Sequence, residues 1–111
     1  MACIFCDIAS GAIPATIVYS SPDVTAFRDI NPQAPTHVLI IPNRHIGSLA
    51  DLGQADKDLL ARLVEVANEL ARREGIAPSG YRVVTNVGPN AGQTVPHLHL
   101  LGGRPMAWPP G

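Results

Sequence analysis

The sequence predicts an α+β fold in which an antiparallel sheet of five short strands packs against one long helix, with one or two short helices besides. Three observations predict this fold class. Short runs rich in β-branched residues are separated by turn residues, one central stretch repeats its apolar residues at helical spacing, and neighbouring runs lie close enough to pair as hairpins. Because 111 residues fit one domain, we expect a single domain over residues 1–111.

The first expected elements are a short helix and a hairpin. Residues 4–9 are long enough for one or two helical turns, and Gly11 is placed to end them. Residues 17–19 form an apolar run that predicts a strand, and the Ser-Pro-Asp sequence at 21–23 predicts a turn. Residues 24–28 then return as a second strand.

The third strand and the long helix follow. Residues 38–41 are apolar on both faces, as in a buried strand, and Pro42 is expected to stop them. The helix is predicted over residues 56–74, with Gly75 as its C-terminal cap. Its apolar stripe at helical spacing consists of Leu59, Leu63, Val66, Ala67 and Leu70.

The last part of the chain predicts a second pair of strands. Residues 81–85 form the fourth strand, residues 88–92 a loop of Gly, Asn and Pro, and residues 95–101 the fifth strand. Gly102 and Gly103 are expected to end this strand, and the tail that follows is expected to be extended.

Composition excludes several classes of protein. The 8 Lys and Arg residues against 9 Asp and Glu residues give no basic patch for nucleic acid. No apolar run approaches the ~20 residues of a membrane span, and the N-terminus does not resemble a signal peptide, so we expect a cytoplasmic protein. Cys3 and Cys6 are too close to staple a domain, which in a reducing compartment favours metal or redox chemistry.

The first candidate site is the histidine pair His97 and His99 on the expected last strand. Side chains alternate across a strand, so both imidazoles face the same way while Leu98 and Leu100 face the core. Such a pair can bind a metal or provide a nucleophile with a supporting base. The motif alone is more often an exposed polar face.

The second candidate site is the segment NVGPNAGQT at residues 86–94, just before the histidines. Its small residues allow backbone N–H groups to converge on an anion, and Gln93 and Thr94 add side-chain donors. The alternative is an ordinary surface loop. Its position favours a phosphate site, because a phosphate held here would lie within a few residues of His97 and His99.

Two further candidate sites each have an alternative, purely structural interpretation. Asp29 ends a strand, and its carboxylate can accept hydrogen bonds from the vicinal hydroxyls of a ribose; a turn aspartate is the commoner local case. Cys3 and Cys6, together with His45 and a second histidine, match the ligand types of a tetrahedral zinc site. The alternative for the cysteines is a buried N-terminal turn.

Four segments in order resemble the histidine triad (HIT) family, and within it the Hint branch of purine nucleoside phosphoramidases. They are IFCDIASGAIPA, FRDINPQAPTHVLIIPNRHI, GYRVVTNVGPNAGQTVPHLH and LGGRPMAWPPG, and together they cover nearly the whole chain. The WPPG ending favours the Hint branch over the dinucleoside polyphosphate hydrolases. The resemblance implies a HIT-like fold and a homodimer, with the long helix and a strand at the interface and the tail reaching towards the partner's site.

The resemblance also implies residue roles. His99 would be the nucleophile, and His37 would orient it or handle protons. His97 matches either a catalytic histidine or, with Cys3, Cys6 and His45, the zinc set of bacterial relatives. The residues implied to bind the nucleotide are Ile4, Phe5, Ile8, Phe27 and Leu39 at the base, Asp29 and Ile30 at the ribose, and Asn86, Gly92, Gln93 and Thr94 at the phosphate.

The chain departs from the family pattern in one place, because a His-Leu unit of the motif H-x-H-x-H is missing. Counting forward from Thr94, His97 and His99 match the first and second histidines; counting back from Gly102, His99 matches the third. The forward count is favoured here, because the phosphate loop fixes the chemistry from its own side. A two-residue deletion keeps every side chain on its face but shortens the strand by roughly 6–7 Å.

The expected activity is hydrolysis of a P–N or acyl-adenylate bond through a nucleotidyl-histidine intermediate, releasing AMP or GMP. No cofactor is expected to be required, and any zinc would be structural. The main alternative is a catalytically impaired, zinc-stabilised nucleotide-binding protein, left by the missing His-Leu unit. A thiol redox protein using Cys3 and Cys6 is a weaker alternative, because the βαβ setting of thioredoxin-like motifs is absent.

Overall fold

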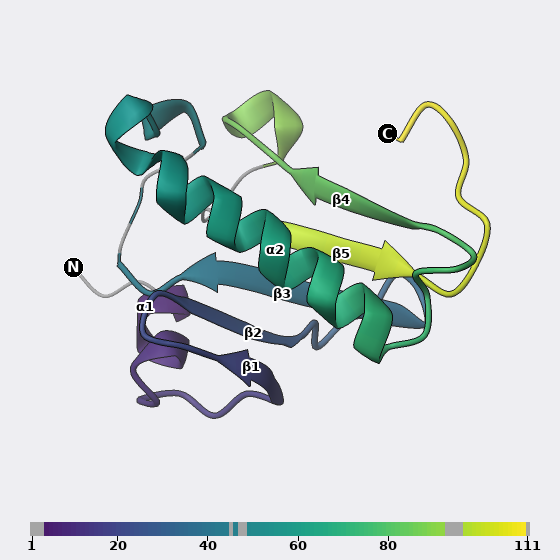
Figure 1. Cartoon of the computed structure of the whole chain (residues 1–111), viewed down its shortest axis with the longest axis horizontal. Coiled ribbons are helices and arrows are strands. Elements are labelled where there is room, and N and C mark those ends of the chain that lie inside the picture. Colours follow the sequence, from purple (N-terminus) through teal and green to yellow (C-terminus); the bar gives the residue numbers. More distant parts are fainter. Residues whose placement is uncertain (1–3, 45, 47–48, 93–96, 111) are drawn as a thin grey trace.

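A five-stranded antiparallel sheet forms the centre of the protein (Figure 1). The structure is a computed structural model that describes residues 4–44, 46, 49–92 and 97–110. The strand order is β1-β2-β3-β5-β4, so β1 and β4 are the edges of the sheet. The strands are β1 (Ile17–Ser20), β2 (Val24–Arg28), β3 (Thr36–Pro42), β4 (Tyr81–Thr85) and β5 (Leu98–Gly102).

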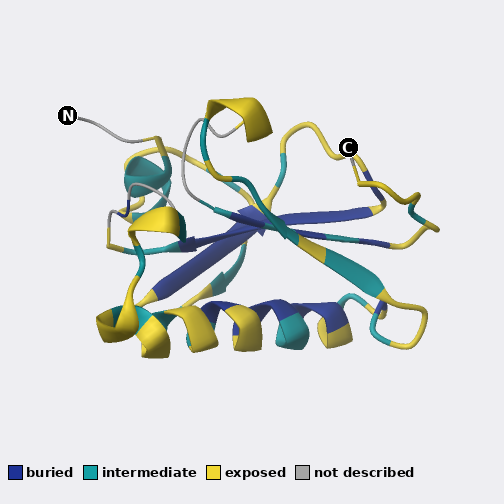
Figure 2. Cartoon of the chain, turned by 90° about the horizontal axis from the view of Figure 1, so that it is seen from above, coloured by how far each residue is buried: buried dark blue, intermediate teal, exposed yellow. Residues whose placement is uncertain are grey.

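The long helix α2 (Lys57–Arg73) covers one face of the sheet. Figure 2 shows its buried side turned to the strands and its exposed side turned to solvent. This arrangement follows from the apolar stripe in its sequence, since a helix buries the face on which apolar residues recur. The main core between helix and sheet includes Val38, Ile40, Leu63, Val66, Ala67, Leu70, Leu98 and Leu100.

The short helix α1 (Ile4–Ala9) packs on the opposite face. Phe5 and Ile8 of α1 contact a smaller buried cluster of Phe27, Leu39 and Ile41. Residues of a strand alternate between the faces, so the residues of β3 and β5 that do not face α2 face this side of the sheet. The strands therefore present two different surfaces, a largely apolar one to α2 and one towards α1 that also carries the histidines.

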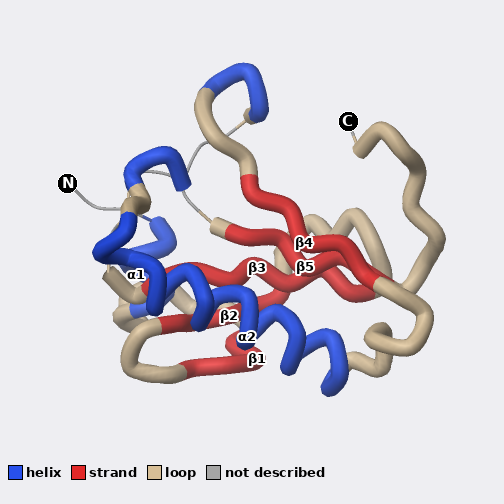
Figure 3. Tube along the Cα trace, turned by 45° about the horizontal axis from the view of Figure 1, so that its top comes forward, coloured by secondary structure: helices blue, strands red, loops and turns tan. Residues whose placement is uncertain are grey.

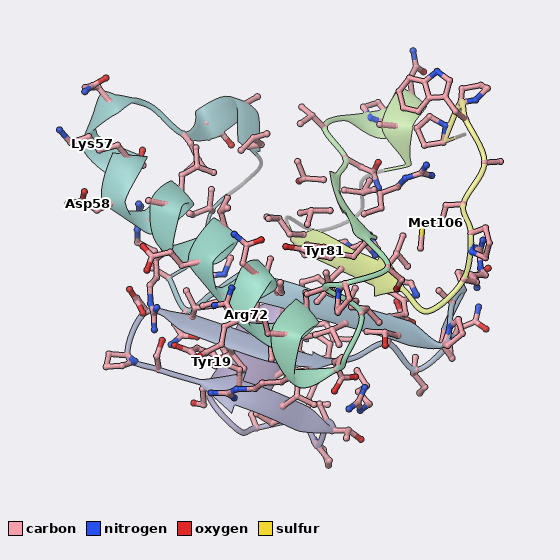
Figure 4. The ribbon with its side chains drawn as sticks, turned by 45° about the vertical axis from the view of Figure 1, so that its right-hand side comes forward. Tyr19, Lys57, Asp58, Arg72, Tyr81 and Met106 are labelled. Atoms are coloured by element: carbon pink, nitrogen blue, oxygen red, sulfur yellow. The ribbon has the colours of Figure 1, made fainter. Side chains whose placement is uncertain are left out.

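The edge strand β1 is joined to α2 by an aromatic contact. Arg62 donates a hydrogen bond to the Tyr19 hydroxyl, and the guanidinium of Arg73 lies 5.9 Å from the centroid of the Tyr19 ring. Figure 4 shows Tyr19 beside the C-terminal half of α2, below Arg72, while Lys57 and Asp58 mark the start of the helix. Within the described residues, no helix is long and apolar enough to cross a membrane.

The predicted fold class is confirmed, and the differences lie at the ends of elements (Figure 3). β3 starts at Thr36 and continues through Pro42, which was expected to stop it but pairs with Val24 at the end of the strand, where a missing N–H is tolerated. β5 starts at Leu98, so His97 precedes the strand. The predicted loop at 88–92 contains a 3₁₀ turn (Pro89–Ala91).

Candidate active site

Three histidine side chains meet on the face of the sheet opposite α2. His37 lies on β3, His99 on β5 and His97 immediately before β5. Nε2 of His37 lies 2.9 Å from Nδ1 of His99, and Nε2 of His99 lies 2.8 Å from Nε2 of His97. His99 is therefore the middle ring of three, with a hydrogen bond at each of its nitrogens.

The backbone amide of Gln33 determines which nitrogens carry protons. This N–H donates to Nδ1 of His37 over 3.0 Å, so Nδ1 must be the unprotonated nitrogen of a neutral ring. His37 then donates from Nε2 to Nδ1 of His99. His99 in turn carries its proton on Nε2 and donates it to the Nε2 lone pair of His97. One amide, whose donor role cannot change, thus orders three imidazoles.

The register of β5 bears on the missing His-Leu unit. Gly102 pairs with Thr36, and a Cβ added at Gly102 would lie 2.5 Å from Cδ1 of Ile76. Packing therefore fixes the glycine end of the strand, and within that register His99 lies opposite Leu39 and bonds to His37. These contacts favour counting back from Gly102, in which His99 matches the third histidine of the family motif and His97 the second.

Asp29 lies between the histidines and the turn that follows β2. Its Oδ1 accepts the Asn31 N–H at 2.7 Å, which is the turn contact considered as the alternative role for this residue. Its Oδ2 lies 3.3 Å from Nε2 of His37. A carboxylate has about four acceptor positions, so both contacts leave capacity for ribose hydroxyls.

Burial lowers the pKa of two of the three rings, His99 and His37, and so favours their neutral forms. Burial, then His97 and His37, lower the pKa of His99 to about 4, although the Asp29 carboxylate opposes the shift. Burial also lowers the pKa of His37, again opposed by Asp29. His37, His99 and His97 form a hydrogen-bonded row that is called the histidine relay below. Neutral rings suit nucleophilic attack, because a protonated imidazole has no lone pair to offer.

We expect the stability of the fold to fall as the pH drops from 6.5 towards about 4. In this window the unfolded chain protonates His99 while the folded chain does not, so protons favour unfolding. Urea unfolding at a series of pH values should show the loss, and it should be weaker in a His99→Gln variant. An unchanged pH dependence in that variant would contradict the depressed pKa.

The predicted base-binding residues divide into two groups. The Phe5 ring stands edge-on to the ring of His97, with 4.9 Å between centroids, and to Phe27 at 5.6 Å. Ile8 and Leu39 pack in the same cluster, so the structure brings four apolar candidates to the histidine face. Ile4 is 54% exposed and Ile30 is 100% exposed, and neither belongs to this cluster.

The expected phosphate loop is only partly described. Asn86 is half-buried directly after β4. The N–H of Gly92 donates to Pro89 O at 3.0 Å, and that of Ala91 donates to Gly88 O at 3.3 Å. These two amides serve the 3₁₀ turn, contrary to the expectation that they converge on an anion. Gln93 and Thr94 lie outside the described residues.

The predicted zinc set cannot be assembled from described residues, since Cys3 and His45 lie outside them. Cys6 is half-buried in α1, and Nε2 of His97 is hydrogen-bonded to His99. Within the part of the chain that is described, the group with ligand atoms near one another is Asp29, His37 and His99, within 4.8 Å. There the Gln33 amide and the imidazole–imidazole bond already use the ring nitrogens facing inwards.

Two residues of this network were not predicted from the sequence. Gln33 acts through its backbone N–H, a group that nearly every residue has, so the residue type gives no sign of this role. Arg104 donates two hydrogen bonds to the carbonyl of Gln33, from Nε at 3.3 Å and Nη2 at 2.9 Å. The only sign of this role of Arg104 in the sequence was its position directly after the glycine pair at the end of β5.

Comparisons with known proteins agree with this geometry. A family model described as the HIT domain matches residues 10–106. The purine nucleoside phosphoramidase of Escherichia coli (strain K12) is 50% identical over 105 residues, which cover 93% of this chain and 88% of that protein. The 14 kDa zinc-binding protein of Zea mays is 51% identical over 113 residues, covering 97% and 87%.

A comparison with solved structures gives the same result as the comparison of sequences. The crystal structure of a HIT family hydrolase from Legionella pneumophila Philadelphia 1 superposes with a TM-score of 0.97 and 54% identity, covering 99% of this chain and 100% of that one. The predicted family, its fold and the predicted enzyme class, a hydrolase, are confirmed. The chain belongs to the HIT family.

Proposed function

We propose that this protein hydrolyses the P–N bond of a purine nucleoside phosphoramidate, or the corresponding bond of an acyl-adenylate, and releases AMP or GMP. The observation that carries the proposal is the hydrogen-bonded chain of three histidines beside an apolar cluster. The base of a purine nucleotide can lie against Phe5 and Phe27 while the α-phosphate of the nucleotide reaches the histidine rings. The phosphoramidase among its relatives supports this substrate class.

His97, rather than His99, is the proposed nucleophile. The lone pair of His99 sits on Nδ1 and already accepts from His37, whereas its Nε2 carries a proton. Nε2 of His97 accepts the proton of His99 Nε2 over 2.8 Å, so His97 presents a lone pair on this side of the ring. Exchanging the hydrogen bond with His99 for phosphorus turns the lone pair of His97 into the attacking group and leaves the proton of His99 ready for the leaving nitrogen.

The reaction then runs in two balanced steps. Nε2 of His97 bonds to phosphorus, and the P–N bond breaks with its electron pair on the leaving nitrogen. That nitrogen takes the proton of His99 Nε2, a proton shifts from His37 to His99, and solvent returns one to His37 past Asp29. In the second step the oxygen of water bonds to phosphorus and gives one proton to Nε2 of His99, and the bond to His97 breaks with its electron pair on Nε2. His99 returns its Nδ1 proton to His37 while His37 releases its own to solvent, so the starting tautomers are restored and the nucleoside monophosphate leaves.

The remaining nucleotide contacts belong to this proposal. Asp29 is assigned to the ribose, with Ile30 beside it, although Ile30 makes no cluster contact. The phosphate is assigned to Asn86, Gly92, Gln93 and Thr94. Donors of Asn86, Gln93 and Thr94 would stabilise charge on the phosphoryl oxygens, whereas Gly92, whose N–H serves the turn, would allow the backbone to approach the phosphate. Ile4, Phe5, Ile8, Phe27 and Leu39 are assigned to the base.

Zinc, if bound by Cys3, Cys6, His45 and His97, is proposed to be structural. A zinc bond to His97 at Nε2 would compete with its role as nucleophile, because one lone pair cannot serve both. The name of the maize relative supports zinc binding in this group of proteins. A cytoplasmic location and the absence of a nucleic-acid partner remain predictions from composition.

Turnover by the purified protein tests the function. A fluorogenic adenosine phosphoramidate should be hydrolysed with and without a chelator, and AMP should inhibit. Binding of AMP without turnover would instead favour the alternative, an impaired nucleotide-binding protein. Activity lost on chelation and restored by zinc, while circular dichroism shows the fold unchanged, would contradict the metal-independent mechanism.

A homodimer through β4 and α2 is also proposed. β4 is an edge strand, and Val83 on it is 42% exposed. Leu60 and Val64 of α2 are 40% and 46% exposed and lie one helical turn apart. An exposed apolar edge is a template for pairing, and a second copy would cover it by two-fold symmetry.

Light scattering tests the dimer. The wild type and an Ile13→Asp control should be dimeric, since Ile13 is exposed but lies in the segment that leads into β1, the opposite edge strand. A Val83→Asp variant should be monomeric at micromolar concentration. A monomeric wild type, or a dimeric Val83→Asp variant, would contradict the proposed interface.

A further inference from the structure

The segment that follows β5 is fastened to the loop between β2 and β3 at two adjacent points. Gly103 has φ +91°, and a Cβ there would lie 2.8 Å from Cβ of Pro35. Arg104 donates to Gln33 O from Nε and Nη2, and its Nη1 donates to Pro105 O at 2.9 Å. A guanidinium that grips one carbonyl with two N–H groups fixes position and direction together.

Gln33 is held by its side chain as well, although the residue is exposed. Its Nε2 donates to Asn31 O at 3.0 Å, which closes the loop on itself. Its backbone N–H is then directed at Nδ1 of His37, a ring that is only 6% exposed. An exposed loop would not keep a 3.0 Å contact to a buried ring unless its own position were fixed.

We propose that Arg104 and the backbone N–H of Gln33 are positioning groups of the histidine relay, because Arg104 holds Gln33 where its amide dictates the tautomers of His37 and His99. Neither group touches the reacting atoms. Without the amide, His37 can carry its proton on either nitrogen. Its Nε2 then no longer always donates to His99, and His99 no longer always presents a proton to His97 and the leaving group.

The tautomers can be measured without turnover. Ring ¹⁵N shifts of histidine separate protonated from unprotonated nitrogens, so they report on the relay even if the proposed function, on which only the kinetic consequence rests, were wrong. In the wild type, His37 should show an unprotonated Nδ1 and a protonated Nε2. A protonated Nδ1 in the wild type would overturn the proposal outright.

Replacing Gln33 by the α-hydroxy acid with the same side chain exchanges the backbone N–H for an ester oxygen and so removes the donor while keeping the side chain. We expect the His37 and His99 shifts to move to values averaged between the two tautomers. Hydrolysis of the phosphoramidate should slow about tenfold in kcat with little change in KM, because the protons and not the substrate contacts are disturbed. Unchanged ring shifts would overturn the proposal.

The variant Arg104→Ala tests the contact between the Arg104 guanidinium and the Gln33 carbonyl, with Arg82→Ala as its matched control. Arg82 also donates to a carbonyl of the tail, from Nη2 to Ala107 O at 2.9 Å, but has no bond to Gln33. Arg104→Ala should give averaged His37 shifts and the same kcat loss, and Arg104→Lys should recover part of it. Arg82→Ala should leave shifts and kcat unchanged. Averaged shifts in both variants, or in neither, would contradict a specific role for Arg104.

Discussion

A His97→Ala variant is expected to lose hydrolysis of the adenosine phosphoramidate by ~10⁴-fold or more while still binding AMP. In the proposed mechanism His97 offers the lone pair that bonds to phosphorus, whereas the proposed base, ribose and phosphate contacts do not depend on this ring being a nucleophile. Steady-state kinetics and calorimetric titration with AMP measure the two effects separately.

The identity of the leaving group separates His97 from His99. A His99→Asn variant should also lose activity on the phosphoramidate, because the leaving nitrogen then lacks its proton donor. It should lose far less on the p-nitrophenyl ester of AMP, whose leaving group needs no proton. The His97→Ala variant should fail on both substrates. The opposite pattern, with the ester still hydrolysed by His97→Ala, would identify His99 as the nucleophile.

An Ile40→Ala variant is expected to lose about 2–5 kcal/mol of unfolding free energy. Ile40 lies on the central strand β3, is 0% exposed and belongs to the core under α2, so truncation leaves a cavity that packed neighbours fill only partly. The matched control is Ile30→Ala, because Ile30 is 100% exposed and should change stability by less than about 0.5 kcal/mol. Urea unfolding of the two variants measures the difference.

Similar losses in both isoleucine variants would contradict the assignment of the core. The control also tests the ribose site. If Ile30→Ala weakens AMP binding without changing stability, the predicted contact of Ile30 forms only with nucleotide present. If it changes neither property, the family-based role of Ile30 does not apply to this chain.

Local periodicity explains why so much of the fold could be predicted. The β-branched runs and the stripe through Leu63, Val66 and Leu70 report burial directly, and burial determines which face each element turns to the sheet. The ends were harder to place. Pro42 could join β3 because it lies at the last pair of the ladder, a tertiary fact, and the 3₁₀ turn at Pro89–Ala91 is too short to show a period.

The sequence predicted where the site lies better than it predicted the chemistry of the site. Which residues meet follows from strand parity, and the side-by-side placement of His97 and His99 was predicted in this way. Which nitrogen carries a proton depends on the Gln33 amide, whose partner His37 lies on another strand from His99. Counting along the motif alone therefore favoured His99 as the nucleophile, whereas the hydrogen bonds favour His97.

Trapping the covalent intermediate tests the central claim most directly. The wild-type protein is mixed with adenosine phosphoramidate, quenched in base within milliseconds, digested and sequenced by tandem mass spectrometry. The account predicts an adenylyl group on His97 in the peptide that also contains His99. An adenylyl group on His99 instead, or turnover with no adenylyl-histidine at any quench time, would contradict it.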